Sequence, residues 1–98
     1  DDCWNKYVGK NKGGVYCLVC NTDKIYQNNF EAGHILSEFN NGDIVLDNLL
    51  PICSKCNKGM GCKNMIDWIT KWYPQNLLRF NNKEYRNLES ISIFSSFF

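Results

Sequence analysis

Two Cys-x-x-Cys pairs constrain this chain more than any other feature, and they bracket its only histidine. The pairs are Cys17-Leu-Val-Cys20 and Cys53-Ser-Lys-Cys56, and the histidine is His34. Two cysteines at this spacing direct both sulfur atoms at one point, which suits a tetrahedral zinc ion with four thiolate ligands. The sequence therefore predicts a structural zinc site that folds the chain around a residue able to act as a base near neutral pH.

A zinc site also suits a chain of this size. Ninety-eight residues make one compact domain with a modest core, and such domains commonly need a metal or disulfides for stability. The six cysteines leave open three disulfides in a secreted protein, although the tight spacing favours metal. We expect the remaining cysteines, Cys3 and Cys62, to be buried thiols, with a disulfide or a further metal site as alternatives.

Nothing at the amino end resembles a signal peptide, and no apolar run approaches the roughly 20 residues of a membrane-spanning helix. We therefore expect an intracellular protein in a reducing compartment, without a membrane partner. A net charge of +1 neither supports nor excludes nucleic-acid binding, because a local basic cluster can suffice. Lys55, Lys58 and Lys63 surround the second cysteine pair and are the candidates for that cluster; a solvated face is the alternative.

The residue pattern predicts both helices and strands, in an α+β fold. Strands are expected over residues 15–20 and 30–36, with a short returning strand over 44–46 after the turn at Asn40-Asn41-Gly42. A short helix is expected near the amino end, and another after Ser54.

A third helix is predicted over residues 64–73, where apolar side chains recur at helical spacing until Pro74. This spacing places Trp68 and Trp72 in the core. We expect residues 1–80 to form the zinc-stabilised domain and residues 81–98 to form a C-terminal extension. The apolar end of this extension, residues 91–98, is expected to pack on the domain or on a protein partner.

The interval between the cysteine pairs, residues 21–52, has room for a functional hairpin. It is longer than the interval of roughly 15 to 20 residues found between the pairs of a small two-pair zinc finger. It contains Gly33-His34-Ile35, the Asn40-Asn41-Gly42 loop and Asn48-Leu-Leu-Pro-Ile, followed at once by Cys53-x-x-Cys56-Asn57. Over about residues 15–65 this order resembles the HNH endonuclease family, especially small HNH domains of large DNA viruses. The resemblance implies a ββα-metal fold with flanking helices, in which one catalytic cation lies between a hairpin and a helix.

The same resemblance implies roles for individual residues. His34 would be the general base that activates water, Asn48 would tie the loop together and orient the histidine, and the side-chain oxygen of Asn57 would bind Mg²⁺ or Mn²⁺. The substrate would be DNA or RNA, and a viral source would place the protein in the host cytoplasm or nucleus. From the residues alone, His34 can also be a structural histidine or a zinc ligand, Asn48 a turn residue and Asn57 a helix cap.

One position departs from the family pattern. Many members have an acidic metal ligand directly before the histidine, where this chain has Gly33. Glu31 faces the same side of a regular strand, about 6 to 7 Å away, and we expect its longer side chain to reach the cation, with a water as intermediary. The alternative function is a catalytically degenerate zinc module that binds nucleic acid or a protein partner.

Overall fold

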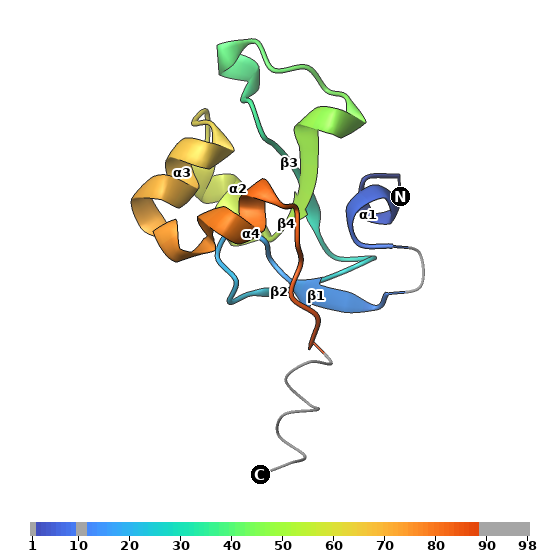
Figure 1. Ribbon diagram of the computed structural model, residues 1–98. Coiled ribbons are helices and arrows are strands. Elements are labelled where there is room, and N and C mark those ends of the chain that lie inside the picture. The colour runs from blue at the N-terminus through green and yellow to red at the C-terminus, as the bar shows by residue number, and fades with distance from the viewer. Residues whose placement is uncertain (1, 10–11, 89–98) are drawn as a thin grey trace.

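The computed structural model describes residues 2–9 and 12–88, and within them helices and two small antiparallel sheets form an α+β fold (Figure 1). The helices and strands are, in chain order, α1 (Asp2–Tyr7), β1 (Gly14–Tyr16), β2 (Lys24–Tyr26), β3 (Glu31–His34), β4 (Leu49–Ile52), α2 (Ser54–Met60), α3 (Met65–Trp72) and α4 (Leu77–Asn81). Short 3₁₀ helices lie in the connecting segments: η1 (Glu38–Asn40), η2 (Leu46–Asn48) and η3 (Pro74–Asn76).

The first hairpin, β1–β2, carries the first cysteine pair in its connection. Val15 pairs with Ile25 in the register of the two strands, and both side chains are buried while their neighbours along each strand are more exposed. This alternation is the period of two expected of a strand with one buried face. The strand ends at Tyr16, earlier than predicted, because the chain then turns around the cysteines with Asn21 in the left-handed conformation (φ 55°).

The second hairpin, β3–β4, leads directly into α2. Its register runs from Glu31 opposite Ile52 to His34 opposite Leu49. The predicted strand over 30–36 is confirmed with shorter limits, whereas the predicted returning strand over 44–46 is wrong. Ile44 is 71% exposed and lies in the long loop, while the apolar run after Asn48 supplies the side chains that can be buried against β3.

The predicted helices after Ser54 and over residues 64–73 are confirmed as α2 and α3. Met65 and Ile69 are the buried residues of α3, and Trp68 packs against the core from a partly exposed position. The expectation that Trp72 belongs to the core is wrong. It is the last residue of the helix and is 54% exposed, and its ring contacts that of Trp68 at a centroid distance of 5.9 Å.

One core joins both hairpins to the helices. Its largest fully buried side chain is Trp4 of α1, and the four paired cysteines belong to the same cluster. The chain after α4 returns to β1, where the Tyr16 amide donates to the Arg86 carbonyl (2.9 Å) and Val15 pairs with Asn87. The first part of the extension therefore packs on the domain, while residues 91–98 lie outside the described residues.

Among the described residues, the helices are too short or too polar to cross a membrane.

Candidate functional site

The four paired cysteines form a cluster that can hold a metal ion such as zinc. The Sγ atoms of Cys17, Cys20, Cys53 and Cys56 all lie within 4.8 Å of one another, and all four residues are buried. Sulfur atoms about 2.3 Å from a tetrahedral zinc ion lie about 3.8 Å apart, close to the 4.0 Å between Cys20 and Cys53. That distance is about twice the length of a disulfide bond, so the four cysteines are not joined by disulfides and could hold a metal.

Backbone amide groups support this arrangement of sulfur atoms. The amides of Asp23 and Cys53 donate to the sulfurs of Cys20 (3.4 Å) and Cys17 (3.3 Å), and the Cys56 amide donates to Cys53 (3.4 Å). Hydrogen bonding with the Cys17 thiol lowers the pKa of Cys20 and raises the pKa of Cys56. Four thiolates so close together repel one another, and a divalent cation at their centre removes that repulsion.

The two other cysteines differ from each other. Cys3 is buried, and burial raises the pKa of its thiol. Cys62 is exposed, so the expectation that it is buried is wrong. It follows Gly61, the residue at the C-terminal end of α2.

His34 lies at the end of β3, on the wall of a hollow of about 390 Å³. This His34 hollow is lined by His34, Ser37, Glu38, Phe39, Asn57, Met60, Gly61, Cys62 and Lys63. The Nε2 atom of His34 is enclosed and has no hydrogen-bond partner among the described residues. Oε1 of Glu38 lies 3.6 Å from this Nε2 atom. The Nε2 nitrogen is therefore held beside an acidic group without a hydrogen bond of ordinary length.

Asn48 fixes the chain that follows His34. Its Oδ1 accepts from the Leu36 amide (2.8 Å), and its Nδ2 donates to the carbonyls of Leu36 and Asp43 (2.9 Å each). The Asn48 carbonyl also accepts from the Ile35 amide (2.8 Å). These four bonds join the two ends of the loop between β3 and β4, directly after the histidine.

Asn57 directly follows Cys56 and reaches from α2 to β3. Its Nδ2 donates to Oε1 of Glu31 (2.8 Å), which leaves the amide oxygen available as an acceptor. Hydrogen bonds from Ser54 and Asn57, with the nearby charge of Lys58, hold the pKa of Glu31 below its usual range. The pair thus offers an ionised carboxylate and an amide oxygen, both hard ligands.

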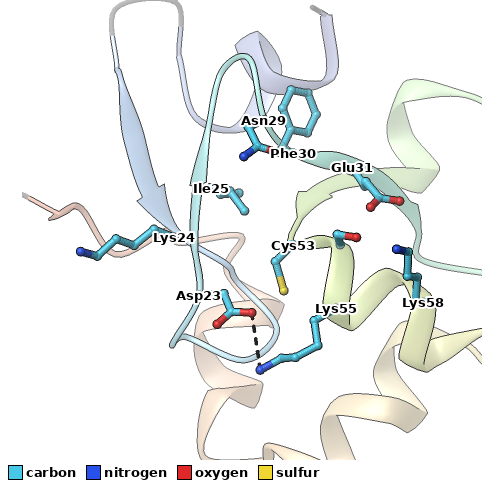
Figure 2. A pocket seen from close by; sticks show the side chains of 10 residues that line it. Asp23, Lys24, Ile25, Asn29, Phe30, Glu31, Cys53, Lys55 and Lys58 are labelled. Carbon is cyan, nitrogen blue, oxygen red and sulfur yellow. Dashed lines mark ion pairs between the residues drawn. The ribbon is translucent and has the colours of Figure 1, made fainter.

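The lysines divide between two hollows. A hollow of about 620 Å³ lies between β2 and α2, and Lys55 and Lys58 line it (Figure 2). Lys55 pairs with Asp23 (3.5 Å), and the Lys58 side chain lies near Glu31. Lys63 instead lines the His34 hollow. Two of the three predicted lysines therefore line one hollow, and the third lines the hollow that contains the histidine.

No family model, curated protein or solved structure matches the chain. The interpretation of the site therefore depends on the chemistry and geometry of its own residues.

Sequence reasoning missed several residues that line or support the His34 hollow. Glu38 follows His34 by four residues, a spacing that brings side chains together in a helical turn, but the segment reads as a loop. Asn64 is the residue before α3, and its Oδ1 accepts from the Ser37 amide and from Asn40 Nδ2, both at 3.0 Å. Phe39 lacks any local pattern that would place it at a site.

Proposed function

We propose that this chain is a divalent-metal-dependent endonuclease of the HNH type, which hydrolyses phosphodiester bonds of DNA on a ββα-metal core formed by β3, β4 and α2. The observation that carries the proposal is the position of His34 and Asn57 on the wall of one hollow. His34 comes from β3 of the second hairpin, and Asn57 comes from α2, whose start carries two of the clustered cysteines. A base and an oxygen ligand thus meet where a phosphate group has room to enter.

The proposed base is the Nε2 of His34, which makes no hydrogen bond among the described residues. In the proposed reaction this nitrogen takes a proton from water while the water oxygen bonds to phosphorus and the bond to the leaving oxygen breaks. The imidazolium that forms lies 3.6 Å from the Glu38 carboxylate, so opposite charges lie close together. The proton then passes to solvent, and the leaving oxygen takes a proton from solvent in turn.

The paired side chains of Glu31 and Asn57 fit a hard divalent cation. The Glu31 carboxylate and the Asn57 amide oxygen are the type of ligand that Mg²⁺ and Mn²⁺ prefer, whereas the four thiolates suit zinc. A cation held there would neutralise charge that grows on the phosphate and the leaving oxygen. Asn48 has the role of a positioning residue, because its hydrogen bonds fix the backbone directly after His34.

A plasmid-nicking assay tests the proposed activity. The zinc-loaded protein is incubated with supercoiled plasmid and Mg²⁺ or Mn²⁺, in parallel with His34→Ala and with reactions that lack the divalent cation or contain a chelator. We expect nicking that requires both the cation and His34, with a loss of about 10²-fold or more in His34→Ala, the usual contribution of a general base. Circular dichroism and zinc content show that each sample is folded.

Absence of cleavage by folded, zinc-loaded protein would contradict the nuclease proposal. DNA binding that weakens steeply with salt would then favour the degenerate nucleic-acid-binding module, because phosphate contacts release counterions. The occupied space beside Gly33 is the observation that favours this second candidate. Capture of a protein partner that requires residues 91–98 and ignores DNA would favour an interaction module.

A further inference from the structure

The wall of the His34 hollow includes a phenylalanine that the fold leaves in solvent. Phe39 is 79% exposed, yet it lines the hollow together with His34 and Lys63. It belongs to η1, in the loop between β3 and β4 that projects from the top of the molecule in Figure 1. An exposed aromatic ring contributes little to the stability of the core, because most of its apolar area stays in water.

Polar side chains below Phe39 hold its backbone in one conformation. Ser37 is buried, and its Oγ accepts from the Asn40 amide (3.3 Å) and from Asn40 Nδ2 (3.0 Å). Asn64 ties the same turn to the start of α3. At Gly42 a Cβ atom would overlap the Leu36 carbonyl, so only glycine lets the loop close beneath η1. The ring is therefore displayed by an ordered turn.

The other groups of the hollow indicate what the ring contacts. Lys63 is suited to an anionic oxygen, and Phe39 presents a flat apolar face on the same wall of the hollow. Glu38 lies next to His34 and repels anions, so the phosphate would lie toward Lys63. A phosphate joined to a planar base combines these features. A hydrophobic peptide would leave the polar groups of this hollow unpaired.

We propose that Phe39 stacks on an unpaired base of a nucleic acid bound in the His34 hollow. The preferred ligand is therefore a single strand or a locally unpaired region, since a base within a duplex has both faces covered. This inference rests on the nucleic-acid binding of the proposed function and is independent of cleavage.

Binding measurements with two oligonucleotides test the stacking contact. Fluorescence anisotropy without added divalent cation compares a labelled oligothymidylate with an abasic strand of equal length. Base–aromatic stacking contributes about 1–3 kcal/mol, so we expect Phe39→Ala to weaken binding of the oligothymidylate about 5- to 140-fold and to leave binding of the abasic strand unchanged. Phe39→Tyr should retain the affinity for the oligothymidylate.

Leu78→Ala is the matched control, because Leu78 is 73% exposed and lies on α4, away from the hollow. It should bind both strands as the unchanged protein does. The inference would be overturned if Phe39→Ala weakened binding of both strands equally or of neither strand. It would also be overturned if the unchanged protein bound no strand. If the protein cleaves DNA but Phe39→Ala does not change oligonucleotide binding, only the stacking contact is refuted. If Phe39→Ala weakens binding as expected but the protein does not cleave DNA, only the nuclease activity is refuted.

Discussion

Gly33 sets the approach of β3 to two side chains, Ile52 and Asn57. A Cβ atom on Gly33 would overlap Cδ1 of Ile52 and lie 3.0 Å from its Cγ1 and 3.3 Å from Oδ1 of Asn57. Ile52 is fully buried and has little freedom to move aside. An acidic residue at position 33 would therefore need a different packing of β4, and in the proposed site the carboxylate comes from Glu31.

This packing predicts an energetic coupling between positions 33 and 52. Gly33→Ala should lower the free energy of unfolding by about 1 kcal/mol, because overpacking costs about 1–3 kcal/mol and exceeds the roughly 0.5–1 kcal/mol that alanine gains over glycine in a strand. Ile52→Val removes the overlapping Cδ1 and alone costs about 0.5–1.5 kcal/mol. In the double variant, the cost of Gly33→Ala should largely disappear.

Urea unfolding of the zinc-loaded single and double variants measures this coupling. Additivity of the two substitutions to within about 0.3–0.5 kcal/mol would contradict the packing described for Gly33.

At the scale of elements, the cysteine cluster joins parts that share few other contacts. The first pair follows β1, and the second pair lies at the start of α2, where Cys53 is the N-cap and accepts from the Cys56 amide. The cluster therefore fixes both the beginning of the helix and its distance from the first hairpin. Asn57 is the residue after Cys56 on α2, so this attachment also sets the position of Asn57.

Loss of a metal ion bound by this cluster should consequently unfold the domain. Structural zinc contributes about 10–16 kcal/mol of apparent binding energy, as much as the entire stability of a typical small domain. We expect Cys56→Ser, or treatment with a strong chelator, to abolish the cooperative thermal transition seen by circular dichroism. Cys62→Ser is the control, because Cys62 is exposed and lies outside the cluster; a metal-free protein that melts like the zinc-loaded form would contradict this expectation.

The sequence predicts those elements whose signal is local. The paired spacing of cysteines predicts their cluster, and the helical spacing of Met65 and Ile69 predicts α3. The sequence does not predict β4, because its residues form a continuous apolar run without alternation. It predicts a strand over Ile44 to Leu46 instead, although these residues lie exposed in the loop. The His34 hollow depends on contacts between Asn64, Asn40 and Ser37 across the chain, for which no local pattern exists.

At the scale of the whole molecule, the segment after α4 connects parts that are distant in sequence. The Arg86 guanidinium lies 3.7 Å from the centre of the Tyr16 ring, and it donates to Oδ1 (3.0 Å) and to the carbonyl (3.2 Å) of Asn21. Tyr85 donates its hydroxyl proton to the Pro51 carbonyl (2.7 Å), in the second hairpin. Two neighbouring residues thus tie both hairpins and the first cysteine turn to the end of the domain.

Arg86→Ala should therefore destabilise the whole domain. Loss of hydrogen bonds to a charged group costs about 1.5–3 kcal/mol, which we discount to about 1–2 kcal/mol because Arg86 is partly exposed. Arg86→Lys should recover only part of this loss, since an ammonium cannot both stack on Tyr16 and reach two oxygens of Asn21. Chemical unfolding at fixed zinc concentration measures the free energy of unfolding of both variants, and Lys24→Ala serves as a control at an exposed position. Equal free energies of unfolding for Arg86→Ala and the unchanged protein would contradict the role assigned to Arg86.

Cys56 and Asn57 are adjacent in the chain, so the chemical state of the cysteine cluster affects the geometry of the proposed cation site at Asn57 and Glu31. An oxidant that joins two of the clustered thiolates as a disulfide takes two electrons from them and releases the metal. The start of α2 then loses its attachment, and Asn57 loses its position opposite Glu31. In the proposed enzyme, oxidative stress would stop cleavage without altering His34, and a reductant supplied with zinc would restore it.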